Sequence, residues 1–525
     1  MLVYTAGLLL APLPVMPFAP GTREFAWAVG ACGALLAAAS FYVARGEWRL
    51  RHRGLLGWKL LAASLITLLF GMALAAGSFV HLVSGKTVGG DLKVEPLESR
   101  CAKGSEGWRV YDADAGHLWN RLYRSLYLRA ARDGREFGRD EVDPLLWPDT
   151  REHLLGGESY ARASACLGEF LDARGERLVT DPLRRAMLQR DLWAVFDWTA
   201  EKSARPTPEL RELQRRLAAA VRRLALSPAQ VESLPDTYRA AADSGAFADD
   251  YDPRAPDTPF LPPGLFRPDG PWVEVAVEGG EAVAPAHVFS ADGRSVFRVF
   301  INLPQGRAAT LAYLRSVAVF KRPWVRDPAN PADPQPNPRL PQFPAGTRLA
   351  LVRQMLVIDE RGEPAPTDIV ESVQIRIHRA LPTDIPDAFD SVGAAARASL
   401  SLYEFRLSRA RLFAGEAGGL RAVARDEHEF PQFQSHGIDP FEDKDARTPI
   451  ERRRITVLGS CVACHFRPGI HSVLSRMPDI VQLRMRDVRR ELIAATGYRR
   501  EADGTKAWKM RRESWRLLRE LWDYS

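Results

Sequence analysis

The sequence predicts an α+β protein with N-terminal transmembrane helices, a helical region, a β-rich region and a C-terminal helical section. Three observations carry this prediction. Two long stretches near the N-terminus are apolar and almost free of charge. Apolar side chains then recur at helical spacing as far as about residue 245, and several segments after residue 271 alternate apolar and polar side chains. At 525 residues, the chain is long enough for a membrane anchor and two or three domains.

Residues 1–85 are expected to form the membrane anchor, with two to three transmembrane helices. Residues 25–44 and 60–83 are each long and apolar enough to cross a bilayer, and residues 1–19 are a third apolar stretch, broken by prolines. The loop of residues 45–53 is rich in arginine, which is typical of a loop that stays in the cytoplasm. We therefore expect a bacterial inner-membrane protein with the bulk of its chain in the periplasm.

Residues 86–245 are expected to form a helical domain. The clearest pattern places Leu210, Leu213, Leu217 and Val221 on one stripe of an amphipathic helix. Such a stripe is a packing face and carries no functional weight.

Residues 246–428 are expected to form a β-rich domain, for which a sandwich is one candidate arrangement. Alternating segments predict strands at residues 272–277, 295–301, 349–358 and 372–378. Residues 323–344 contain many prolines and predict an extended excursion. In the last strand His378 falls on the face opposite Val373, Ile375 and Ile377, so we expect its side chain to be solvated.

The C-terminal section, residues 429–525, contains the motif Cys461-Val-Ala-Cys464-His465, and two expected helices, 478–496 and 506–524, follow it. Two thiols three residues apart can reach both vinyl groups of one haem, and the adjacent histidine can then reach its iron. These five residues resemble the attachment signature of c-type cytochromes. The resemblance implies one covalent haem c, thioether bonds from Cys461 and Cys464, and His465 as the proximal iron ligand.

The second axial ligand of the iron is less well indicated. Met477 is the first candidate, because the 12 residues that separate it from His465 span about 40 Å of extended chain. His436 and Met510 are further candidates. An iron site left open on this side is also compatible with the sequence.

Two readings of the motif do without haem. Cys461, Cys464 and His471 could supply three zinc ligands, with His436 or another residue as the fourth, since cysteine and histidine are the usual ligands of structural zinc. The same two cysteines could also form a disulfide or a redox pair. Elsewhere, Cys101 and Cys166 could pair in an oxidising compartment.

The function that follows is single-electron transfer by a membrane-anchored haem protein, an electron carrier more than a classical enzyme. Its partner would be a redox protein or the quinone pool. The 72 basic residues are set against 65 acidic ones without a clustered basic face, which argues against nucleic acid. A peroxidase-like haem enzyme with an open iron site and a haem-free, zinc-binding scaffold are the alternatives. The sequence does not indicate an oligomeric state.

Overall fold

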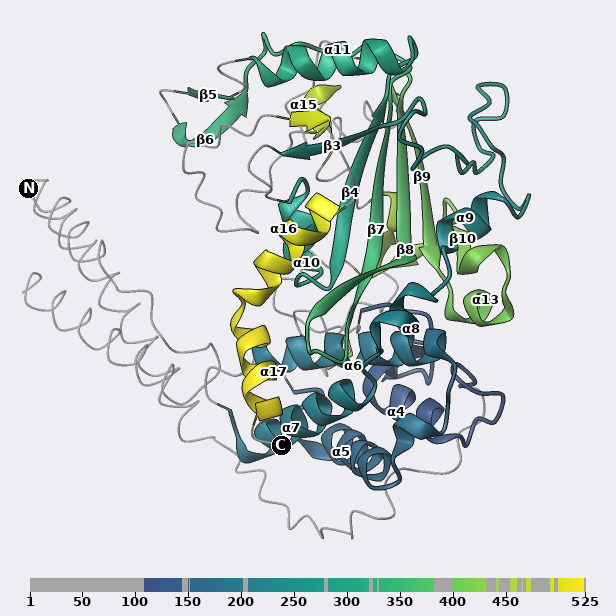
Figure 1. The fold of residues 1–525 in the computed structure, drawn as a ribbon, viewed down its shortest axis with the longest axis vertical. Helices are drawn as coiled ribbons and strands as arrows, with labels where there is room; N and C mark the ends of the chain where they lie inside the picture. Colours follow the sequence, from purple (N-terminus) through teal and green to yellow (C-terminus); the bar gives the residue numbers. More distant parts are fainter. Residues whose placement is uncertain are drawn as a thin grey trace, which may run out of the picture. The chain divides into compact units, whose positions relative to one another are not determined.

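The fold described below belongs to residues 96–525, one of the two units into which the chain divides in the computed structural model. Its described residues are 108–523, except for 144–149, 151, 202–205, 278–281, 321–323, 328–329, 382–398, 431–440, 443–453, 460–464, 466–468, 474–491 and 495–498. Within these residues a helical layer lies against one end of an antiparallel sheet, and the C-terminal helices run along both (Figure 1).

The helical layer comes first in the chain. Its helices are α4 (Leu118–Tyr127), α5 (Gly157–Asp172), α6 (Pro182–Glu201), α7 (Pro208–Arg223), α8 (Pro228–Glu232) and α9 (Thr237–Ala242), with the short pair β1 (Arg129–Ala130) and β2 (Glu136–Phe137) and the turn η2 (Gly175–Arg177) between them. Local sequence fixes several of the helix starts. Thr207 caps α7 by accepting a hydrogen bond from the Leu210 backbone, and Pro208 occupies the first turn.

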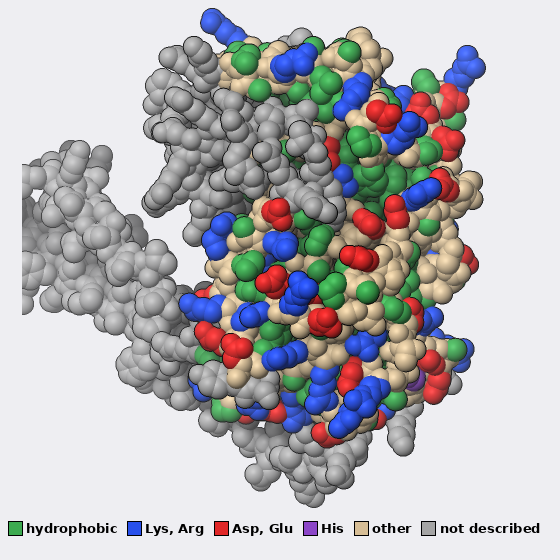
Figure 2. Space-filling model, viewed as in Figure 1, with side chains coloured by type: hydrophobic (Ala, Val, Ile, Leu, Met, Phe, Trp, Pro, Cys, Tyr) green, Lys and Arg blue, Asp and Glu red, His purple; other side chains and the backbone are tan. Residues whose placement is uncertain are grey.

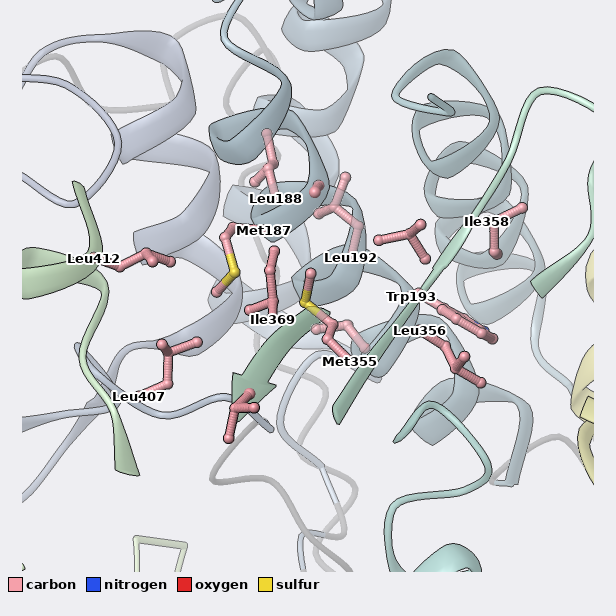
Figure 3. Close-up of a cluster of buried hydrophobic side chains, with 14 of the residues drawn as sticks. Met187, Leu188, Leu192, Trp193, Met355, Leu356, Ile358, Ile369, Leu407 and Leu412 are labelled. Carbon is pink, nitrogen blue, oxygen red and sulfur yellow. The ribbon is translucent and has the colours of Figure 1, made fainter. Parts of the chain in front are cut away.

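Helix α6 is the centre of the core, because its side chains are buried all around from Ala186 to Ala200. Met187, Leu188, Leu192 and Trp193 lie in one buried cluster with Met355, Leu356 and Ile369 of the sheet strands (Figure 3). One hydrophobic cluster therefore includes side chains from the helices, the sheet and the C-terminal helices. The predicted boundary between residues 245 and 246 lies inside this cluster.

The sheet has seven antiparallel strands in the order β10-β9-β8-β7-β4-β3-β13. The strands are β3 (Val273–Val277), β4 (Ser295–Asn302), β7 (Arg348–Ile358), β8 (Pro364–His378), β9 (Leu400–Leu407), β10 (Leu420–Ala422) and β13 (Leu492–Ala494). Two further two-stranded pairs are β5 (Trp324–Asp327) with β6 (Asn330–Pro336), and β11 (His428–Glu429) with β12 (Ile455–Thr456). The helix α13 (Arg409–Ala414) and the turn η3 (Ala417–Gly419) connect β9 to β10.

The two faces of the sheet are covered by different parts of the chain. Face A, with Val296, Val352 and Val373, joins the large cluster of the helical layer. Face B, with Phe297, Val299, Leu351, Arg353 and Arg376, is covered by α10 (Pro285–Ser290), α11 (Arg307–Ala318), α15 (Ile470–Val473) and α16 (Arg499–Met510). Successive side chains along each strand therefore point alternately into two buried cores, and neither face of the described sheet is left to solvent.

Helix α17 (Glu513–Asp523) ends the described chain against the helical layer. Trp515 contacts Trp193 with 5.8 Å between ring centroids, and the Trp522 indole N–H donates a 2.8 Å hydrogen bond to the Ala218 carbonyl oxygen. The predicted helix 506–524 is therefore divided between α16 and α17. The predicted helix 478–496 lies mostly outside the described residues, and its residues 492–494 form strand β13 instead.

A buried ion network joins these layers. The Arg294 guanidinium lies 2.7 Å from the Asp197 carboxylate of α6 and 3.0 Å from Asp143. The Lys509 ammonium of α16 lies 2.7 Å from Asp197 and 2.8 Å from Asp292. Arg294, Asp197, Asp292 and Lys509 are all buried, so each charge depends on the others for its stabilisation.

The predicted fold class is corrected in its membrane part. No helix among the described residues is long and apolar enough to cross a membrane. The longest described helix, α6, carries charges such as Arg190 and Asp197, and these are paired inside the protein. The anchor 1–85, with the spans 25–44 and 60–83, lies outside the described residues. The transmembrane helices, the inner-membrane location and the periplasmic placement of the bulk are therefore withdrawn.

The predicted sandwich is also replaced by a single sheet. Helices and long connections cover both of its faces, so in the described chain no second large sheet packs on it. The pattern that suggested a sandwich was correct in finding strands with buried faces. It could not show that the covering layers are helical.

Cys166 on α5 is disulfide-bonded. The other four cysteines lie outside the described residues, so its pairing with Cys101 stays a prediction.

The ion network predicts an acid-dependent loss of stability. Burial alone would raise the pKa of Asp143, but Arg353, Arg190 and Arg294 hold that pKa well below its ordinary value. A lowered folded-state pKa contributes stability above the unfolded pKa, and that stability is lost as pH falls through the folded-state pKa. We expect Asp143→Asn to lower the free energy of unfolding at pH 7 by about 3 kcal/mol.

The difference in the free energy of unfolding between wild type and Asp143→Asn should become smaller as pH falls below about 4. In this range Asp143 is protonated in the unfolded wild-type chain, so its lowered pKa in the folded state contributes less stability. Urea denaturation of both proteins at neutral and acidic pH measures this difference. A difference that stays constant over this range would show that Asp143 does not stabilise the fold through its charge.

Candidate functional site

His465 is the residue of the Cys461-x-x-Cys464-His465 motif that lies within the described part of the chain. Cys461 and Cys464 lie outside it, as do Met477 and His436. Met510, another candidate for the second axial ligand, is described at the end of α16 and is 51% exposed. Its position on the surface makes it a poor candidate for a buried ligand.

The segment after His465 is fixed to face B of the sheet. Ile470 is buried in a cluster with side chains of β3, β4 and α11. Its backbone N–H donates a 2.7 Å hydrogen bond to the side-chain oxygen of Gln342, which also accepts one from the Phe343 backbone at 3.1 Å. These contacts hold the start of α15 in one place.

Gly469 makes this close approach possible. Its φ of +59° lies in the left-handed region that favours glycine. A Cβ atom added there would lie 2.0 Å from the Gln342 side-chain oxygen. The chain therefore turns from His465 into α15 at a position where a side chain would be strained by its backbone and by its neighbour.

The orientation of His465 is set by a backbone hydrogen bond. Its Nδ1 atom lies 2.7 Å from the Ser472 carbonyl oxygen. A carbonyl oxygen can only accept, so Nδ1 must carry the proton and donate it. In the neutral ring the lone pair then resides on Nε2. Metal-bound histidines commonly have this arrangement, with the second ring nitrogen donating to a backbone carbonyl.

A second histidine faces His465 from α10. The rings of His287 and His465 are nearly parallel, with an interplanar angle of 4° and 6.1 Å between their centroids. His287 also lies 5.3 Å from the ring of Phe297 on β4. The fold thus brings together two imidazoles that are 178 residues apart in the sequence.

Positive charge and apolar surface surround this pair. Burial, followed by Arg376 and Arg353 on face B, lowers the pKa of His287 to about 4. Burial, followed by Arg376 and His287, lowers the pKa of His465 well below its ordinary value. Both imidazoles are therefore neutral at pH 7, which is the form that binds metals.

His378 is close by and corrects a prediction. Its side chain is buried rather than solvated, with its ring 4.9 Å from that of Phe343. Burial, and to a smaller degree Arg376, lowers its pKa to about 3. The alternation pattern placed His378 on the correct side of its strand, but face B is covered as well as face A.

These residues fit a haem iron better than the described residues fit zinc. Two neutral, parallel imidazoles can supply two nitrogen ligands. No group of three or more histidine, cysteine or acidic side chains that could hold a metal occurs among the described residues. Of the zinc ligands suggested by the sequence, Cys461, Cys464 and His436 lie outside that part, and of His471 only the backbone, in α15, is described.

Sequence reasoning missed His287. The residue lies in a six-residue helix, 178 positions before His465, with no motif around it. The packing of α10 on β4, and of Ile470 in the cluster of β3, β4 and α11, bring it to His465.

Comparisons of this chain with protein-family models, with curated proteins and with solved structures give no match.

The turn at Gly469 provides a test of the local geometry. We expect Gly469→Ala to lower the free energy of unfolding by about 2 kcal/mol or more, through backbone strain together with loss of the hydrogen bonds that Gln342 accepts from the Ile470 and Phe343 backbones. Gly415→Ala is the matched control, because Gly415 has a φ of +72° but nothing within 4 Å of an added Cβ. The control should cost only about 1 kcal/mol, as measured by urea denaturation. Equal losses would mean that the Gln342 contact does not constrain the turn.

Proposed function

We propose that this protein binds one haem covalently, as a c-type haem protein, and transfers single electrons. The observation that carries the proposal is the hydrogen bond between His465 Nδ1 and the Ser472 carbonyl oxygen. It directs the lone pair of a neutral imidazole away from the backbone, as a metal ligand requires. The histidine so arranged is the one that directly follows the two cysteines of the motif.

Each residue has a separate role in this proposal. Cys461 and Cys464 attach the ring, and His465 holds the iron from the proximal side. The Ser472 carbonyl keeps the His465 ring in one orientation and makes its ligating nitrogen more basic. Bound haem supplies an iron centre that gains and loses one electron.

The surroundings of His465 support a carrier more than a haem enzyme with an open iron site. An enzyme of that kind needs room for a substrate beside the iron, whereas here His287 lies parallel to His465. A redox protein or a quinone would be the electron partner. The surface shown in Figure 2 mixes basic and acidic side chains, so it does not favour a partner of one charge.

Covalent attachment is the first prediction of this proposal. The full chain would be produced together with a cytochrome c maturation system, and haem absorbance would be measured after denaturation and removal of free haem. We expect about one haem per chain to remain in the wild type. The double variant Cys461→Ala, Cys464→Ala should retain none, because thioether bonds are the only attachment that survives unfolding.

Two controls make the result decisive. Circular dichroism of the double variant would show whether it folds, and metal analysis of the wild type would measure zinc. Folded wild-type protein with no covalent haem, and one zinc per chain, would overturn the proposal in favour of a zinc-binding scaffold.

A further inference from the structure

We propose that His287 is the second axial ligand of the haem iron, so that the haem is coordinated by two histidines. This inference rests on the proposed function and replaces Met477 as the expected ligand. It is carried by the geometry of the pair His287–His465 and by the way α10 is held.

The separation of the two rings matches ligation of one metal ion. Imidazole nitrogens bind transition metals at about 2.0 Å, so two rings on opposite sides of one ion have their centroids about 6 Å apart. The observed distance is 6.1 Å, with the ring planes 4° from parallel.

His287 is held rigidly, as a preorganised ligand should be. Its neighbour Val288 is fully buried in a cluster with Phe297. The His287 carbonyl oxygen accepts a 3.0 Å hydrogen bond from the Ala291 backbone and a 2.9 Å bond from the Ser290 hydroxyl. With its backbone fixed and its ring beside Phe297, the imidazole has little freedom to leave the position facing His465.

The chain after α10 adds a second constraint. Asp292 has a φ of +46°, an unfavourable conformation for a residue with a side chain. Its carboxylate accepts a 2.8 Å hydrogen bond from Lys509, and it lies 3.4 Å from Arg512. The buried ion pair therefore holds the turn that follows α10, five residues beyond His287.

Two histidine ligands have specific consequences for the haem. Both axial positions are filled, so the iron is low-spin and closed to small external ligands. The reduction potential is lower than a histidine–methionine pair would give, because methionine ligation raises it. Electron transfer then occurs without ligand exchange at the iron.

The test uses the full-length chain carrying haem, with optical and electron paramagnetic resonance spectra as its readouts. Wild-type protein should be low-spin, without the weak red absorption band of a methionine–iron(III) bond, and its reduced form should not bind carbon monoxide. His287→Ala should retain covalent haem in the denatured spectrum but become high-spin. Its reduced form should bind carbon monoxide at about one per haem.

Three comparisons separate ligation from a structural role. Added imidazole should restore the low-spin spectrum of His287→Ala, which would not happen if the substitution had only disturbed the fold. His378→Gln removes a nearby buried histidine and should leave the spectrum unchanged. Met477→Leu should also have no effect.

Several outcomes would overturn the assignment. A wild-type spectrum with methionine ligation that is lost in Met477→Leu would assign the ligand to Met477. Carbon monoxide binding by wild type would mean that the iron site is open. An unchanged low-spin spectrum in His287→Ala would also exclude His287. Absence of covalent haem from the wild type is a separate result, because it would overturn the proposed function itself.

Discussion

The buried ion network around Arg294 is the constraint on which the rest of this structure depends. Arg294, Asp197, Asp292 and Lys509 are removed from water, where an unpaired charge would cost several kcal/mol. These groups come from α6, from the turn before β4, and from α16. The charges are satisfied only when the helical layer, the sheet and the C-terminal helices are assembled together. The network therefore selects one arrangement of three parts that hydrophobic packing alone would hold less specifically.

The candidate site depends on this network through a short piece of chain. Helix α10 carries His287 and leads directly into the turn of Asp292 and Gly293, and then into Arg294 and β4. Gly293 has a φ of +67°, and a Cβ added to it would lie 2.8 Å from the Trp508 ring. The same turn is thus held by charge through Asp292 and by close packing against α16. An alteration in the C-terminal helices would reach the imidazole pair by this route.

Much of the secondary structure could be predicted from the sequence, because periodicity reports it directly. The stripe from Leu210 to Val221 is a packing face of α7, and all the alternating segments after residue 271 include strands. What could not be predicted is which layers cover them. Val373 and Arg376 lie on opposite sides of β8, and the alternation cannot show that both sides are covered. His378 is buried for this reason.

The candidate site also has one part that the sequence could predict and one part that it could not. The motif identifies His465 because its spacing is local and carries its own chemistry. His287 is invisible to such reasoning, since only the long-range pairing of strands places it beside His465. The acidic partners of Arg294 are equally hidden, because Asp143 and Asp197 look like ordinary charged residues in the sequence.

The path of the C-terminal chain determines whether that segment can be separated from the rest of the fold. After α15 the chain adds β13 to the sheet, where Ile493 lies opposite Ala276 of β3. It then passes α16 along β4 and ends with Trp522 hydrogen-bonded to α7. The segment with the cysteine motif is therefore interlaced with elements that precede it by some 200 to 300 residues. Removing the C-terminal segment would therefore take away a strand of the sheet and expose apolar side chains of α6, α7 and β4 that it covers.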